Sequence, residues 1–270
     1  MSIFGFIGVG NMGSAILKSC SETFGKDKIV YYDLSSKNCE AISSKLNIEP
    51  EENNASVLKK SKYIILAVKP QVIKKVLYEI KPDIKPDHVI ISLAVAVSIQ
   101  SIKQILGHST KVVRTMPNTP ALISKGTTGV SFSSDEFTDD EKAIINRFLL
   151  SFSKYEVFDE SLMNAVTCAS GSSPAYVYMF IEALADSVVS LGIPRDKAYK
   201  LVANTVLGSA AMVLETQMHP GLLKDQVCSP GGTTIAAIKS LEEYGFRNAL
   251  MKATDACYES ANEISSANNN

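Results

Sequence analysis

The glycine-rich segment Gly8-x-Gly10-x-x-Gly13 constrains the fold of this chain more than any other feature of its sequence. The apolar run Ile3–Ile7 precedes it, as expected for a short buried strand, and Ser14–Leu17 follows it as the opening of a helix. In such a unit the first glycine permits a tight turn, the second lets the backbone approach a pyrophosphate, and the third lets helix and strand pack closely. Glycine-rich turns also occur in purely structural roles. The flanking strand and helix favour dinucleotide binding over a structural turn.

An acidic residue at the end of the next predicted strand completes the dinucleotide pattern. Lys28–Asp33 is typical of a strand, and Asp33 follows the loop at the expected spacing of about twenty residues. A carboxylate there accepts hydrogen bonds from the ribose hydroxyls of an adenosine and disfavours a 2′-phosphate. Ser35, Ser36 and Lys37 could still bind a phosphate, and Asp33 could instead cap the helix that begins near Ser35. The cofactor is therefore predicted to be NADH or NADPH, with NADH favoured.

The composition is that of a globular protein long enough for two domains. The chain has 270 residues, of which 46% are hydrophobic and 20% are charged, and its formal net charge is −1. The absence of a basic stripe argues against nucleic acid and anionic membrane as partners. The longest apolar stretch, Val89–Val97, is too short to span a bilayer, and the apolar N-terminal run has no basic segment before it, so we interpret it as a strand rather than a signal peptide.

The five cysteines are scattered along the chain without a C-x-x-C pair. No histidine lies at ligand spacing from any of them, so the sequence predicts no metal site. Free thiols in a reducing compartment are the simplest interpretation, and we expect a cytoplasmic protein.

Apolar runs alternate with helical patterns in the first part of the chain, and strands then disappear. This alternation predicts a Rossmann-like, doubly wound parallel sheet, with a dinucleotide-binding domain at residues 1–160 and an all-α dimerisation and substrate domain at residues 161–270. Small or polar residues end the predicted strands, at the edge where ligands bind in open α/β sheets. The predicted helix Ala175–Leu191 is apolar on nearly every face, so we expect a second subunit to cover it.

A second constellation, Ser229-Pro230-Gly231-Gly232-Thr233-Thr234, lies in the predicted all-α part. Ser229 suits an N-cap and Pro230 the first helical position, which an ordinary helix start would also explain. Paired glycines in a first turn cost helix stability, however, and they leave the backbone N–H groups accessible. With the two threonine hydroxyls they would form an uncharged anion cradle of carboxylate size. The segment therefore favours a binding site over a simple cap.

The chain has no Lys, Arg or His from Tyr155 to Pro194. Reduction of a ketone needs a proton donor, usually a positioned His or Lys. The three histidines, His88, His108 and His219, lie where surface or capping roles are expected. A cyclic imine is basic enough to arrive protonated, so its reduction needs hydride, orientation and a carboxylate anchor but no strong acid.

These motifs resemble those of the pyrroline-5-carboxylate reductase family, which catalyses the last step of proline synthesis. The resemblance covers essentially the whole chain, and Ser173 stands where the family usually has glycine. The matching segments are Gly5–Met12, Ala67–Pro70, Asn118–Pro120, Ser170–Tyr176 and Asp225–Glu242. The segment Asp225–Glu242 is highly specific for the family, whereas the glycine motif is shared with many dehydrogenases.

The resemblance implies an NAD(P)H-dependent oxidoreductase that transfers hydride to the C=N bond of 1-pyrroline-5-carboxylate and gives L-proline. It also implies a homodimer with interleaved C-terminal helices, and rings of dimers in many members. The implied dinucleotide contacts, joined by Asp33 from the pattern above, are Ile7, Gly8, Val9, Gly10, Asn11, Met12, Asn54, Ala67, Val68, Lys69 and Pro70. The implied substrate contacts are Glu160, Ser229, Gly231, Gly232, Thr233 and Thr234, with Thr234 in a catalytic role.

Two other classes of protein share parts of this pattern. A β-hydroxyacid dehydrogenase has the same two-domain plan but would need a lysine on the first long helix of the second domain, and that segment has none. A dinucleotide sensor or scaffold that has lost its chemistry would have no need of the Ser-Pro-Gly-Gly-Thr-Thr cradle. A spectrophotometric assay of NADH consumption with the imine, with small keto acids and with neither would separate the three.

Overall fold

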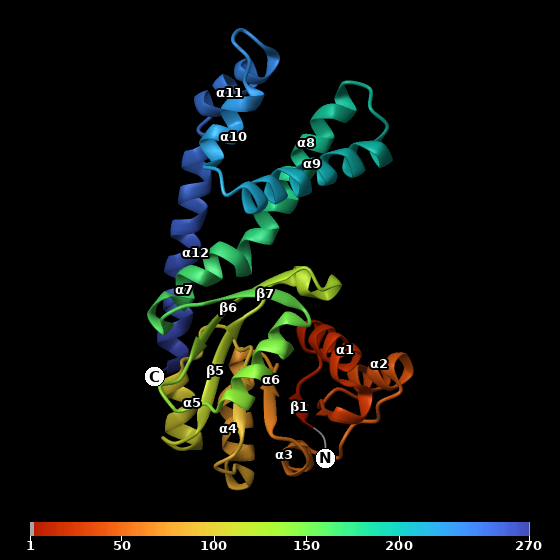
Figure 1. Ribbon diagram of the computed structural model, residues 1–270, viewed down its shortest axis with the longest axis vertical. Coiled ribbons are helices and arrows are strands. Elements are labelled where there is room, and N and C mark those ends of the chain that lie inside the picture. Colours follow the sequence, from red (N-terminus) through yellow and green to blue (C-terminus); the bar gives the residue numbers. More distant parts are fainter. Residues whose placement is uncertain (1–2, 270) are drawn as a thin grey trace. The chain divides into compact units, whose positions relative to one another are not determined.

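The computed structural model describes residues 3–269, which divide into two compact units (Figure 1). The first unit contains the chain up to Ser172 and again from Cys257 onward, and the second comprises Ser173–Ala256. The last helix therefore begins in the second unit and ends in the first. The domain boundary expected between residues 160 and 161 stays a prediction.

A seven-stranded sheet forms the centre of the first unit, with the strand order β2-β1-β3-β4-β5-β6-β7. The first five strands are parallel, which confirms the predicted parallel Rossmann-like sheet. β6 is antiparallel to β5, with Met116 opposite Gly129, because the few residues between them are too short a connection for a parallel crossover. The strands are β1 (Phe4–Ile7), β2 (Ile29–Tyr32), β3 (Tyr63–Leu66), β4 (Val89–Ser92), β5 (Lys111–Met116), β6 (Gly126–Phe132) and β7 (Ser153–Val157).

Helices cover both faces of this sheet, and each face has its own apolar core (Figure 1). On one face α1, α2 and α6 pack on side chains such as Phe4 and Phe6, and on the other α3, α4 and α5 pack on side chains such as Ile64 and Ile90. The first-unit helices are α1 (Asn11–Phe24), α2 (Ser36–Leu46), α3 (Asn54–Lys60), α4 (Pro70–Ile80), α5 (Ile99–Leu106), α6 (Asp139–Leu150) and α7 (Met163–Val166), followed by a π-helix (Thr167–Ser172).

Side-chain caps fix where several of these helices begin. Ser35, Asn53, Ser98 and Thr138 each accept a hydrogen bond from a backbone N–H in the first turn of the helix that follows. The sequence pattern predicts helices at residues 36–46, 54–60 and 99–106, and these are the bounds of α2, α3 and α5 in the structure. Local capping chemistry is visible in the sequence, so these helix starts could be placed without tertiary information.

The second unit is helical throughout and has a small core of its own. Its buried residues Ala185, Ala198 and Val202 lie where α8 and α9 meet. The sequence His219-Pro220-Gly221 predicts an interruption between helices, and it does not predict the short helix α10 that begins there. His219 caps that helix, its Nδ1 accepting from the Gly221 N–H. The helices here are α8 (Ser173–Ser190), α9 (Arg195–Thr216), α10 (Pro220–Val227), α11 (Thr233–Glu243) and α12 (Phe246–Asn269).

A buried carboxylate joins α6 to two strands at the edge of the sheet opposite the glycine-rich loop. Glu141 contacts Lys62 through Oε1 at 2.9 Å and Lys111 through Oε2 at 2.7 Å, and its side chain is 3% exposed. The Thr138 N–H also donates to Oε2, which completes a capping box at the start of α6. Burial raises the pKa of Glu141, but the hydrogen bonds from Lys111, Lys62 and Thr138 outweigh burial and lower it to about 2.

We predict that Glu141 makes the stability of the protein depend on pH in acid. Its folded pKa of about 2 lies below the ordinary 4.5, so its contribution is complete above pH 4.5 and is lost as the pH falls through 2. The shift corresponds to about 3 kcal/mol of unfolding free energy. The free energy of unfolding, measured with urea between pH 3 and pH 6, should fall toward acid, and Glu141→Gln should make this fall clearly smaller. Asp139→Asn, on the exposed side of the same helix turn, should keep the wild-type fall. A wild-type fall in Glu141→Gln would contradict the assignment.

Candidate active site

The turn between β1 and α1 is formed by glycines that the packing requires. Gly8 has φ of +89°, and a Cβ there would lie 2.9 Å from the Ala67 carbonyl oxygen. A Cβ on Gly13 would lie 2.5 Å from the Gly8 carbonyl oxygen, so this glycine lets α1 approach the strand. Gly10 differs, because a Cβ there would meet nothing within 4 Å. The first and third glycines thus serve the fold, and the second faces open space.

The start of α1 can bind an anion. Gly10 is the N-cap and provides no side-chain hydrogen bond, and the first backbone N–H groups of a helix have no partners within it. A cavity of about 570 Å³ borders this turn, lined in part by Val9, Gly10, Asn11 and Ser14. Exposed N–H groups with the helix dipole suit a pyrophosphate.

Asp33 is held by two backbone N–H groups from either side. Its Oδ2 accepts from the Val9 N–H at 2.7 Å and its Oδ1 from the Ser35 N–H at 2.8 Å. Ser35, and not Asp33, caps α2, its Oγ accepting from the Asn38 N–H. The alternative that Asp33 merely caps this helix is therefore wrong. Each carboxylate oxygen keeps a lone pair for a ribose hydroxyl.

The remaining residues of the predicted dinucleotide set lie around the same edge of the sheet. Ala67 and Val68 follow β3 directly, and Lys69 is the N-cap of α4, with Pro70 as its first residue. Asn54 opens α3 and is buried, with its Nδ2 donating to Glu79 Oε1. Its Oδ1 has no hydrogen-bond partner among the described residues. An exposed helix start, an oriented carboxylate and an unpartnered buried acceptor together fit a dinucleotide.

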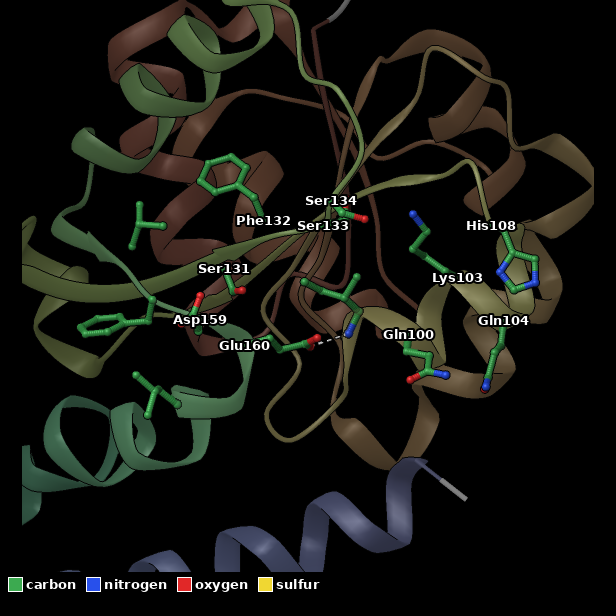
Figure 2. A pocket seen from close by; sticks show the side chains of 14 residues that line it. Gln100, Lys103, Gln104, His108, Ser131, Phe132, Ser133, Ser134, Asp159 and Glu160 are labelled. Atoms are coloured by element: carbon green, nitrogen blue, oxygen red, sulfur yellow. Dashed lines mark hydrogen bonds between the residues drawn. The ribbon is translucent and has the colours of Figure 1, made fainter.

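Glu160 lies in the first unit, beside a cavity of about 810 Å³ (Figure 2). Its Oε1 accepts from the Ile99 N–H at 2.6 Å and contacts the Arg114 guanidinium at 3.0 Å. Figure 2 shows Glu160 directed at the start of α5, with Lys103 and His108 farther along the cavity wall. Sequence reasoning missed Arg114, which is buried within β5.

The predicted carboxylate cradle lies in the second unit, at the start of α11. The expectation that Ser229 caps the helix and Pro230 begins it is wrong. Gly232 is the N-cap and Thr233 the first helical residue, because Ser229–Gly232 form a turn closed by the Gly232 N–H on the Ser229 carbonyl oxygen. The free N–H groups therefore begin at Thr233 and Thr234. Within residues 3–269, neither hydroxyl of these two threonines has a protein hydrogen-bond partner.

The predicted site residues are distributed over the two units. The dinucleotide residues and Glu160 belong to the first unit, and Ser229–Thr234 belong to the second. Of the histidines, His219 caps α10, one of the two roles expected for it. His88 is buried rather than on the surface, and its Nδ1 accepts from the Lys85 N–H in the turn before β4. Burial lowers the pKa of His88.

The described residues contain no cluster of three His, Cys, Asp or Glu side chains able to hold a metal ion. Across the part of the chain that the structure describes, no helix is both long and apolar enough to cross a membrane. The cysteines, at positions 20, 39, 168, 228 and 257, are all free thiols.

Two family models match the chain, and both agree with its two-part plan. "NADP oxidoreductase coenzyme F420-dependent" matches residues 3–96, and "Pyrroline-5-carboxylate reductase dimerisation" matches residues 160–264. The chain is 44% identical to pyrroline-5-carboxylate reductase of Escherichia coli strain K12 over 97% of each protein. It is 37% identical to that of Pisum sativum, over 97% of this chain and 95% of the pea protein. The crystal structure of Plasmodium falciparum pyrroline carboxylate reductase with NADP bound has a TM-score of 0.88 at 30% identity, over 98% of each chain.

The parallel sheet, its glycine-rich loop and these similarities define an oxidoreductase that depends on a nicotinamide dinucleotide. Within that class, the full-length relatives leave no choice between families. The chain belongs to the pyrroline-5-carboxylate reductase family, as its motifs predicted, and carries that family's dimerisation domain.

Proposed function

We propose that this chain reduces 1-pyrroline-5-carboxylate to L-proline, with NADH used in preference to NADPH. The observation that carries the proposal is similarity at 44% identity, over 97% of both chains, to a protein named for this reaction. The residues support it, since one chain combines an exposed helix start beside Asp33 with an uncharged Ser-Pro-Gly-Gly-Thr-Thr segment.

In the proposed reaction the bound reduced nicotinamide supplies a hydride. This hydride would add to the carbon of the protonated C=N bond, and the π electrons of that bond would become the lone pair of the ring nitrogen. The N–H groups after Gly10 would bind the pyrophosphate, and Asp33 would accept from the adenosine ribose. Ile7, Met12, Asn54 and the Ala67–Pro70 turn would complete the dinucleotide site. A substrate that arrives protonated explains why the chain has no Lys, Arg or His from Tyr155 to Pro194.

The substrate carboxylate would be held at the start of α11. Ser229, Gly231, Gly232 and Thr233 would surround it with hydroxyl and N–H donors, which an anion needs. Thr234 would hydrogen-bond the reacting ring and act as the catalytic residue. Glu160, whose Oε1 is taken by Ile99 and Arg114, would line the site.

We also propose that the chain works as a homodimer, through its C-terminal helices, in the cytoplasm. α8 exposes Val177, Tyr178, Met179 and Phe180, and apolar side chains on α9 and α12 are similarly exposed. Such a surface needs a partner. Five free thiols suit a reducing compartment.

The reaction is tested by following NADH absorbance with purified protein. We expect oxidation with 1-pyrroline-5-carboxylate and none with small keto acids or without substrate. Equal or faster oxidation with a keto acid would refute the assignment of the substrate.

We predict that Thr234→Ala lowers kcat roughly ten- to hundredfold, because a hydrogen bond to a charged group is worth about 1.5–3 kcal/mol. Ser240→Ala removes a hydroxyl from the exposed surface of the same helix and should leave kcat unchanged. Steady-state kinetics of both variants provide the measurement. Wild-type kcat in Thr234→Ala would place the catalytic contact elsewhere.

We predict that Asp33→Ser weakens or reverses the preference for NADH. Removing the carboxylate removes its repulsion of a 2′-phosphate, which should shift the ratio of kcat/KM for the two cofactors roughly tenfold toward NADPH. Asp27→Asn removes an exposed charge near the other end of β2 and should leave the ratio unchanged. A wild-type enzyme faster with NADPH at equal low concentration would contradict the preference but not the reaction.

A further inference from the structure

The side-chain amide of Asn54 is satisfied at one end only. Its Nδ2 donates to Glu79 Oε1 at 2.9 Å, and the residue is 4% exposed. Its Oδ1 is buried and has no hydrogen-bond partner among the described residues. A buried acceptor without a donor costs free energy and calls for an explanation. The atom needs a donor that the described residues do not supply.

Glu79 determines which polar atom of the Asn54 side-chain amide stays without a hydrogen-bond partner. An ionised carboxylate only accepts hydrogen bonds, so it selects the NH₂ group of Asn54 and would repel its oxygen. Glu79 lies on the exposed side of α4, whereas the neighbouring positions Leu77 and Ile80 are buried in the core. Its contact with Asn54 therefore orients a buried group from the surface.

Asn54 lies at the edge of the sheet that carries the dinucleotide residues. α3 packs directly on β1, since a Cβ on Gly5 would lie 2.5 Å from Val57 Cγ1 and would also collide with Ser61. α3 leads back to the start of β3, so it runs antiparallel to β1. Asn54 precedes Val57 by one turn on the same face and thus lies nearer the end of β1, where the glycine-rich loop begins.

Asn54 also lies toward β2, the strand followed by the residue that is expected to bind the adenosine ribose. The Glu51 N–H donates to the Tyr31 carbonyl oxygen, so the segment just before α3 runs along β2. Asp33, the residue expected to bind the ribose, directly follows the end of β2. The unpartnered Oδ1 of Asn54 is therefore placed to serve the same sugar as Asp33.

We propose that Glu79 is a positioning residue that selects the cofactor, by holding Asn54 with its Oδ1 toward the adenosine ribose. This inference rests on the dinucleotide site proposed above. A 2′-hydroxyl can donate to Oδ1, whereas a 2′-phosphate offers acceptors to an acceptor and brings negative charge toward Glu79. Glu79 thus acts with Asp33 against NADPH, although it touches the cofactor only through Asn54.

The test measures equilibrium binding of NADH and NADPH by cofactor fluorescence, which the absence of tryptophan favours. Glu79→Gln removes a negative charge and allows the side-chain amide of Asn54 to turn its NH₂ group toward the cofactor. The affinity for NADPH should therefore rise roughly three- to tenfold, and the affinity for NADH should fall by no more than about threefold. Glu79→Asp keeps the charge but is one methylene too short for the contact. This variant should lower the affinity for NADH as much as Glu79→Gln does, and it should raise the affinity for NADPH by less. At saturating cofactor kcat should stay at the wild-type value in both.

Two controls separate orientation from bulk charge and from folding. Glu52→Gln removes an exposed charge two residues before Asn54 that makes no hydrogen bond within residues 3–269, and it should leave the binding ratio unchanged. In an Asn54→Ala background Glu79→Gln should lose most of its effect, because the two residues act as a pair.

Three results would overturn the proposal: an unchanged ratio in Glu79→Gln, an equal shift in Glu52→Gln, or Glu79→Asp behaving as wild type while Glu79→Gln shifts. The last result would mean that Glu79 acts only through its negative charge and does not orient Asn54. Failure of the dinucleotide site itself would look different, since the wild-type protein would then bind neither cofactor.

Discussion

Close packing between the first turn of α1 and the ends of β1 and β3 is the constraint on which the nucleotide edge depends. Gly8 and Gly13 allow this approach, since any larger side chain at either position would meet backbone atoms within 3 Å. The approach brings the Val9 N–H to 2.7 Å from Asp33, which joins the end of β1 to the end of β2. The helix start after Gly10 and the Asp33 carboxylate, the two groups proposed to bind the dinucleotide, are therefore oriented by backbone contacts before any ligand binds, so ligand binding need not order them.

Much of the fold could be predicted because its signals are local. The starts of α2, α3 and α5 follow from Ser35, Asn53 and Ser98, whose side chains cap the helix next to them. The direction of β6 could not be predicted, because an apolar run carries no information on strand orientation. α10 and the start of α11 were misplaced for a related reason. Proline and glycine near His219 and Ser229 fit either a helix start or a turn, and only tertiary packing decides between them.

The residues of the candidate site likewise fall into those that local sequence signals predict and those that depend on contacts between distant parts of the chain. The glycine-rich loop and Asp33 follow a spacing that the chemistry of dinucleotides imposes on the sequence. The contacts of Glu160 with Arg114 and of Asn54 with Glu79 join residues 46 and 25 positions apart, on different elements. Glu79 in particular resembles any exposed acid on an amphipathic helix. Its significance appears only once the partner amide and its unpartnered oxygen are seen.

The two units differ in how they are stabilised, and this difference bears on the two halves of the site. The first unit buries large side chains on both faces of its sheet, so the dinucleotide residues rest on a complete core. α10 and α11 bury no residue within the chain, and α8 exposes apolar side chains such as Met179 and Phe180. Isolated helices of this length are marginally stable in water and depend on tertiary contacts. In the proposed dimer the partner would supply those contacts. The geometry at Thr233 and Thr234, and with it substrate affinity, would then depend on association, whereas dinucleotide affinity would rest on the first unit alone.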